Sequence, residues 1–228
     1  MIRNLKVLLA AALALTALGA IAASAHAADE FNCSATPCRG TLKPDGTGKT
    51  AHHVFIVENT AKTESVSFTC ETLSGEGSIA TSPATQVTAE NLNYANCTAN
   101  GSSGVVVDMN GCTYSFKALN GTTDGAEVTV ACPTGKQIEI TYNGCVMDVK
   151  GGFSATGIGY STVGVSPNRE ITATTSNVVI PEAQIKATGT KAQCLINPEQ
   201  ALLGTYTTGN TLVTGETAGG EMKDAWYA

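Results

Sequence analysis

The chain has 228 residues, with 19 acidic against 13 basic side chains, and therefore a formal net charge of −6. An acidic chain without clusters of Lys and Arg has no electrostatic footprint for nucleic acid or for an anionic membrane surface, so both partners are excluded. Only 5% of the residues are aromatic and 24 are glycine, so we expect a thinly filled hydrophobic core.

Residues 1–27 have the pattern of a secretory signal peptide. Arg3 and Lys6 precede a continuous apolar run, and the triplet Ala25-His26-Ala27 stands before the first acidic residues, as a cleavage site would. Cleavage removes two basic and no acidic residues, which leaves a net charge of about −8. A retained membrane anchor is the alternative, but no second apolar span follows. We expect residues 28–228 to be a single domain, secreted or in the cell envelope, with a subdivision near residue 150 left open.

Short runs of alternating apolar or β-branched residues follow one another along the mature chain and predict β-strands. These runs begin at His52, Ser65, Gly104, Cys112, Ala126, Lys136, Cys145, Gly157, Arg169 and Asn177. Clusters of Gly, Asn, Asp, Ser and Pro separate them, at spacings of about ten residues. The pattern predicts an antiparallel all-β domain, either a two-sheet sandwich or a flattened barrel. Only 181–187 and 196–203 suit a helix, for two turns at most.

Two stretches, 97–117 and 132–150, repeat one order of features: cysteine, turn, strand, Asn-Gly, cysteine, strand. Asn-Gly between alternating runs is the strongest short-range hairpin signal, because both central residues of a type I′ turn need positive φ. The sequence therefore predicts a duplicated hairpin unit. In the first copy Tyr114 and Phe116 fall on the same strand face as Cys112.

The eight cysteines all lie after the cleavage site, and an even number in an exported chain indicates four disulfides. They are Cys33, Cys38, Cys70, Cys97, Cys112, Cys132, Cys145 and Cys194. Symmetry about the turns at 120–125 and 82–85 favours Cys112–Cys132 and Cys70–Cys97. Cys33 and Cys38 bracket a short loop, which leaves Cys145 with Cys194. Pairing within each repeat, Cys97–Cys112 and Cys132–Cys145, is the main alternative.

No motif predicts a nucleotide, metal or serine-hydrolase site. The segment 45–50, DGTGKT, lacks the first glycine of a phosphate-binding loop, so we interpret it as a polar turn. His52 and His53 would point to opposite faces of a strand and make a poor chelate, and no zinc-like spacing accompanies them. Ser161 is followed by glycine three positions later, whereas a nucleophile elbow needs it two positions later.

Glu139 and Asp148 are the candidates for a pair of carboxylates that could hydrolyse a glycosidic bond. They lie on neighbouring predicted strands, but each alternates with apolar residues, as side chains on a solvated sheet face do. The only tryptophan, Trp226, is the third residue from the end. The pattern therefore favours an exposed sheet face over a sugar-binding cleft.

The chain resembles a group of uncharacterised exported proteins of soil actinobacteria. The resemblance rests on HHVFIVE, SFTC, NYANC, MNGCTYSF, VACPTGKQIEITYNGC and GTYTTGNTLVTG. It spans most of the mature chain and implies no activity, substrate or catalytic residue. Proteins of that group lack counterparts of Cys33 and Cys38, and this joint absence fits a bridge between the two.

We therefore expect a non-enzymatic structural, adhesive or ligand-binding module of the extracellular space, without a cofactor. Its partner would be an extracellular protein or glycan, and no feature marks self-assembly. An extracellular hydrolase or carbohydrate-acting enzyme is one alternative, and a pocket that brings together two carboxylates, or a histidine and a serine, would support it. The other is a protease-inhibitor-like protein that presents the loop 120–125.

Overall fold

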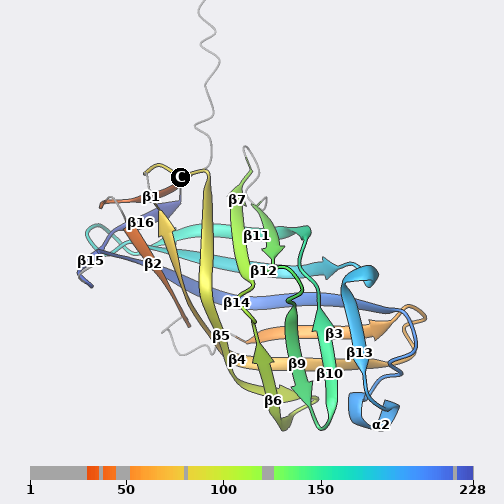
Figure 1. Ribbon diagram of the computed structural model, residues 1–228. Helices are drawn as coiled ribbons and strands as arrows, with labels where there is room; N and C mark the ends of the chain where they lie inside the picture. Colours follow the sequence, from red (N-terminus) through yellow and green to blue (C-terminus); the bar gives the residue numbers. More distant parts are fainter. Residues whose placement is uncertain are drawn as a thin grey trace, which may run out of the picture.

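The structure, a computed structural model, describes residues 30–35, 38–44, 52–79, 82–119, 126–217 and 220–227. The predicted signal peptide and the loops 45–50 and 120–125 lie outside these residues. Nearly every element is a β-strand, so the predicted all-β class is confirmed (Figure 1). Of the two architectures expected, the barrel is the one that forms.

Eight antiparallel strands make the closed wall of the barrel. In pairing order they are β2 (Cys38–Pro44), β4 (Ser65–Ile79), β5 (Gln86–Ala99), β7 (Thr113–Ala118), β8 (Ala126–Ala131), β11 (Phe153–Val163), β12 (Glu170–Ile180) and β14 (Leu202–Glu216), which pairs with β2 again. This is also their order along the chain, so the wall is an up-and-down meander. A further strand, β3 (His53–Asn59), continues the line of β2 and pairs with the other halves of β4 and β14.

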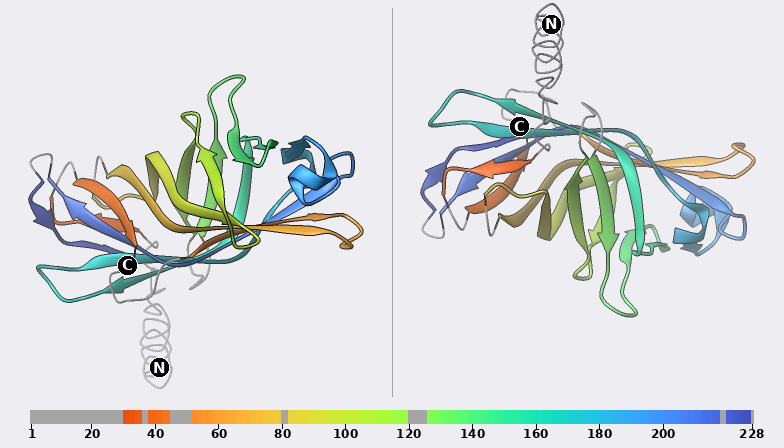
Figure 2. Two further views of the ribbon diagram at one scale, coloured as in Figure 1. Left: turned by 90° about the horizontal axis from the view of Figure 1, so that it is seen from below. Right: turned by 90° about the horizontal axis from the view of Figure 1, so that it is seen from above.

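Four more strands come from excursions of the chain between wall strands. They are β6 (Ser102–Asp108), β9 (Ile138–Tyr142), β10 (Cys145–Val149) and β13 (Ile185–Thr188). They extend the sheet from the edge of β5 and form a layer that faces β3 and the adjoining half of β4 (Figure 2). Their inward residues, such as Ile140 and Met147, share one buried cluster with Phe55 and Val57 of β3. We call these four strands the added sheet.

The opposite end of the barrel carries a small two-stranded sheet, β1 (Phe31–Cys33) with β16 (Ala225–Tyr227). The Phe31 ring lies 5.0 Å from that of Tyr160 and 5.3 Å from that of Tyr227. Another short strand, β15 (Met222–Lys223), pairs with β14. Between β15 and β16, the buried Asp224 accepts hydrogen bonds from the backbone and the guanidinium of Arg169.

The helical expectations are met only in part. Within 181–187 there is a single 3₁₀ turn, η1 (Glu182–Gln184), and the following residues become β13 because they pair with β10. Residues 196–203 form no helix. A one-turn helix, α2 (Lys191–Cys194), precedes them and ends at Leu195 in the left-handed conformation, and Pro198 disfavours helical backbone at the residue before it.

The two Asn-Gly pairs behave differently. Asn143 and Gly144 form the two-residue turn between the paired strands β9 and β10, as predicted. Asn110 and Gly111 also have positive φ, and the Cys112 amide donates to the Met109 carbonyl across the turn. The expectation of a hairpin there is nevertheless wrong, because β6 pairs with β5 and β9, and β7 pairs with β5 and β8. This turn returns the chain from the added sheet to the barrel wall.

The disulfide prediction is confirmed in all four pairs. The bridges are Cys33–Cys38, Cys70–Cys97, Cys112–Cys132 and Cys145–Cys194. One of them joins residues that face each other, because Cys70 and Cys97 are register partners on β4 and β5. Cys145–Cys194 attaches α2 to the added sheet. The alternative pairing within each repeat is excluded.

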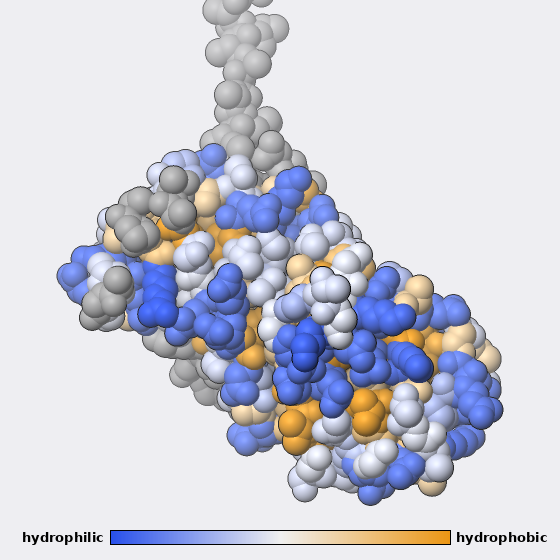
Figure 3. Space-filling view, in the orientation of Figure 1, coloured by the Kyte–Doolittle hydropathy of each residue, from blue (hydrophilic) through white to orange (hydrophobic). Residues whose placement is uncertain are grey.

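On the outer surface of the described residues, the exposed apolar side chains lie singly or in small patches. Figure 3 shows hydrophilic residues over much of the face seen in Figure 1, with small apolar patches between them. The most exposed large apolar side chains include Val106 and Val165, and scattered residues of this kind are ordinary on protein surfaces. In the part of the chain that the structure describes, no helix is both long and apolar enough to cross a membrane.

Candidate functional site

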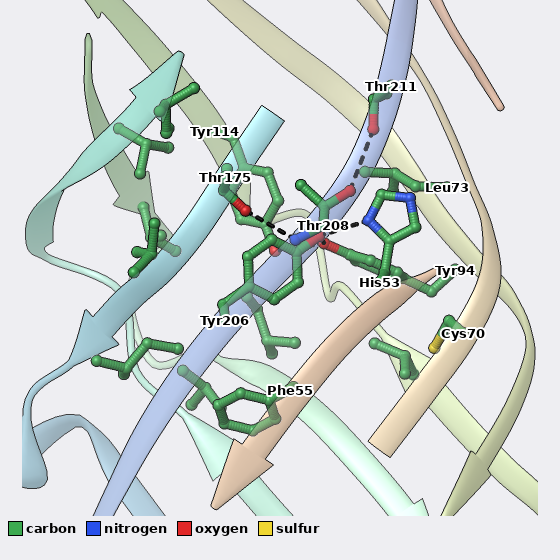
Figure 4. Close-up of a pocket in the computed structure, with 18 of the residues that line it drawn as sticks. His53, Phe55, Cys70, Leu73, Tyr94, Tyr114, Thr175, Tyr206, Thr208 and Thr211 are labelled. Atoms are coloured by element: carbon green, nitrogen blue, oxygen red, sulfur yellow. Dashed lines mark hydrogen bonds between the residues drawn. The ribbon is translucent and has the colours of Figure 1, made fainter. Parts of the chain in front are cut away.

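The interior of the barrel is not completely filled. A cavity of about 140 Å³ lies where the barrel wall meets the added sheet, and its lining is almost entirely carbon (Figure 4). Side chains from every wall strand contribute, together with β3, β6, β9 and β10. An eight-stranded barrel has an interior that side chains can just fill or that can hold one small ligand. The size of the lining side chains therefore decides which of these occurs.

Short side chains on two adjacent strands leave the space open. Ala173 and Thr175 of β12 and Thr208 and Thr211 of β14 all line the cavity. The Thr208 amide donates to the Thr175 hydroxyl at 2.9 Å, and the Thr208 and Thr211 hydroxyls lie 3.4 Å apart. Because these hydroxyls bond within the wall, this side of the cavity presents mainly methyl groups.

Next to the short side chains, four polar rings form a continuous chain of hydrogen bonds (Figure 4). The His53 Nδ1 atom lies 2.7 Å from the Tyr206 hydroxyl, which lies 3.1 Å from the Tyr94 hydroxyl. The Tyr94 hydroxyl in turn lies 3.2 Å from that of Tyr114. The rings come from β3, β14, β5 and β7, so closure of the barrel is what brings them together. We call this set the His-Tyr chain.

Every member of the His-Tyr chain is uncharged near neutral pH. Burial raises the pKa of Tyr94 and Tyr114 well above the usual value, and it also raises that of Tyr206. Burial lowers the pKa of His53 to about 4, with a smaller contribution in the same direction from the charge of His52. Neutral groups are the less costly form in an apolar interior. The cavity therefore combines an apolar lining with one neutral polar edge.

A second, smaller space lies toward the other end of the barrel. It measures about 60 Å³ and shares Leu42, Phe116 and Ala173 with the lining of the larger cavity. The Tyr160 hydroxyl, at this end, is buried without a hydrogen-bond partner. The interior is thus loosely packed on both sides of Phe116, as the composition led us to expect.

The structure places the predicted histidines on opposite faces, as expected. His52 is exposed, whereas His53 is 3% exposed and faces the cavity. The Nε2 atom of His53 has no hydrogen-bond partner. Ser161 lies exposed on β11 and is not part of the cavity lining, so the structure does not bring it to His53.

Glu139 and Asp148 are direct cross-strand neighbours on the outer face of the added sheet. Asp108 lies opposite Glu139 on its other side, and Lys186 lies opposite Asp148. The residues next to them along each strand, such as Ile140 and Met147, point to the buried face. The carboxylates therefore stand in a row on this face rather than across a cleft, but Glu139 and Asp148 are half-buried and not fully exposed as predicted, and the Oδ1 atom of Asp148 is buried without a hydrogen-bond partner.

Sequence reasoning placed Tyr114 on the same strand face as Cys112 but did not single out Tyr94 or Tyr206. Both lie on strands that the pattern did not predict, β5 and β14. Tyr94 alternates with polar and small neighbours, and Tyr206 sits in a Thr-rich run. The only local signal is a single large aromatic among small residues.

Comparisons with known proteins give no independent lead. No family model matches the chain, and neither the curated proteins nor the solved structures contain a match. Among the described residues, no group of three or more His, Cys, Asp or Glu side chains is arranged to hold a metal ion. The functional argument therefore rests on the cavity itself.

Proposed function

We propose that this protein is an extracellular, non-enzymatic binding protein that holds one small, largely apolar molecule inside its barrel. The observation that carries the proposal is the cavity of about 140 Å³ with its carbon lining and buried His-Tyr chain. An apolar cavity of about 150 Å³ stays free of water and takes up benzene. The space here suits a molecule of similar size.

The extracellular setting is supported by the disulfides. All eight cysteines are paired, and no described cysteine is free. Disulfides of this kind persist in oxidising compartments and are reduced in the cytosol. The N-terminal pattern of an exported protein points the same way.

Binding rather than catalysis is supported by the chemistry of the lining. The polar groups that face the cavity are an imidazole, phenols and threonine hydroxyls. The raised pKa values of the tyrosines and the lowered pKa of His53 keep these groups neutral, so they can form hydrogen bonds with a ligand. The nearest sequence candidates for acid-base catalysis, Glu139 and Asp148, stand on the outer face of the added sheet.

The test measures thermal unfolding of the exported, disulfide-bonded protein with benzene, toluene, phenol and indole. A ligand at one hundred times its Kd stabilises the folded state by about 2.7 kcal/mol, so we expect Tm to rise by several degrees. Ala173→Leu should fill the cavity and abolish the rise. Thr174→Leu is the matched control, because the adjacent side chain is exposed. If no compound raises Tm up to its solubility limit, the proposal is wrong.

A further inference from the structure

A gap in the barrel wall lies along one edge of β5. The other edge of this strand pairs with β4, whereas this edge pairs with β7 over residues 86–89 and with β6 over residues 97–99. No described strand pairs with residues 90–96 on this edge. β6 leaves β5 because its last three residues pair with β9. The gap is therefore bounded by β5 on one side and by β6, the following turn and β7 on the other.

Local features of the sequence fix both sides of this gap. Against β4, the strand β5 has one extra residue between Glu90 and Asn93, and Asn91 has a positive φ of 51°. Asparagine adopts this conformation more readily than most residues, and a bulge of this kind bends its strand. On the other side, the Cys112–Cys132 bridge anchors the residue that precedes β7. The gap is therefore part of the design of the wall.

The gap opens to the outside through a hollow of about 500 Å³ on the surface. Residues 90–93 of β5 and 106–109 of β6 form much of its lining. Among the described residues, Val107 alone lines both this hollow and the apolar cavity. Val107 is half-buried, so one part of its side chain meets solvent while another faces the cavity. A single side chain therefore separates the cavity from the outside at this point.

Val107 is also the side chain that can move most easily there. The two strands beside the gap contribute Tyr94 and Tyr114 to the cavity lining (Figure 4). Their hydroxyls lie 3.2 Å apart, and that of Tyr94 lies 3.1 Å from that of Tyr206, so displacing either ring breaks hydrogen bonds. Rotation of Val107 from one staggered rotamer to another moves two methyl groups and breaks no hydrogen bond.

We propose that ligands enter and leave the cavity through the gap between β5 and β6, and that the side chain of Val107 is the gate. This inference rests on the proposed function, since it describes access to that same cavity. Entry by this route needs one side chain to rotate. Entry between paired wall strands would instead break several backbone hydrogen bonds at once, each of which costs free energy.

The test measures the binding rates of fluorobenzene by ¹⁹F NMR exchange on the disulfide-bonded protein. Fluorobenzene is close in size to benzene, which an apolar cavity of about 150 Å³ accepts. Val107→Phe should obstruct the gap and lower kon by about tenfold, which corresponds to a barrier higher by about 1.4 kcal/mol. Val107→Ala should raise kon by about threefold. Val179→Phe is the matched control, because Val179 is exposed in a second surface hollow that shares no lining residue with the cavity.

The association rate is the decisive quantity, because Val107 also lines the cavity. A side chain that only contacts the bound ligand changes mainly koff, whereas a gate changes kon. An unchanged kon in Val107→Ala would overturn the inference, even if Val107→Phe binds no fluorobenzene. An unchanged kon in Val107→Phe, or an equal fall in Val179→Phe, would also overturn it, and all these results leave the binding function intact. If the wild-type protein binds neither fluorobenzene nor benzene, the proposed function itself fails.

Discussion

Burial of His53 predicts a specific loss of stability in acid. The folded-state pKa is about 4, against an ordinary value of 6.5. Above pH 6.5 the imidazole is neutral in both states and the full stability is present. As the pH falls from 6.5 toward 4, the unfolded chain binds a proton that the folded protein does not, so stability falls. Each pKa unit is worth about 1.4 kcal/mol, which gives a loss of about 3 kcal/mol.

Urea unfolding at constant ionic strength, between pH 7.5 and pH 4, measures this loss. Carboxylates also titrate in the lower half of the range, so the informative quantity is the difference between the wild-type protein and His53→Leu. The variant should lack about 3 kcal/mol of the pH dependence, whereas His52→Ala should retain most of it, because burial of His53 is the larger cause of its lowered pKa. Equal slopes in the wild-type protein and in His53→Leu would refute the argument that the ring is buried neutral.

Three further substitutions test the scaffold. Cys112→Ser breaks one bridge and should cost about 2–5 kcal/mol in urea unfolding; an unchanged midpoint would show that the bridge contributes nothing. A Cβ at Gly204 would lie 2.7 Å from the Phe55 ring, so Gly204→Ala should cost about 1–3 kcal/mol through overpacking, and a neutral result would mean that the neighbours yield easily. Glu139→Gln relieves repulsion from a carboxylate on each side and should add about 0.5–1 kcal/mol. The gain from Glu139→Gln should shrink in 1 M salt, and a salt-independent change would contradict an electrostatic origin.

The strands that local patterns predicted are those with alternating β-branched or aromatic residues. The run from His52 became β3, whose alternate residues are buried, and the run from Cys145 became β10 in the same way. The strands β5 and β14 were missed, because their outward residues are polar and many inward ones are small. Their strand conformation depends on pairing with β4 and β12, which no local pattern reveals.

Two of the disulfides, Cys70–Cys97 and Cys112–Cys132, could be predicted because each spans one hairpin, whereas Cys145–Cys194 was the pair that remained. Cys70 and Cys97 lie at equal distances from one turn and are register partners. The turn at Asn110 and Gly111 shows the limit of this reasoning. Local φ preferences produced the turn, but they do not determine which strands pair, and both edges of β6 were already used by β5 and β9.

The candidate site could not be read from the sequence, because its members are distant along the chain. His53 and Tyr206 are 153 residues apart, and Tyr94 and Tyr206 are 112 apart. Pattern analysis predicted that His52 and His53 point to opposite faces, and this is confirmed, since only His53 faces the cavity. The Nδ1 atom of His53 and the hydroxyls of the three tyrosines meet because the barrel closes. Closure is a property of the whole wall and not of any local segment.

The composition does explain why there is a cavity at all. A wall of eight strands fixes the width of the interior, so the side chains must supply enough volume to fill it. On β12 and β14 several inward positions are held by short residues such as Ala173, Thr175 and Thr208, which leave part of the interior unfilled. Such a gap is maintained only if the wall does not collapse, and the closed pairing together with the Cys70–Cys97 and Cys112–Cys132 bridges resists collapse. The low aromatic content and the four disulfides, which looked like separate facts in the sequence, therefore have one structural consequence: a rigid barrel with room for a small molecule.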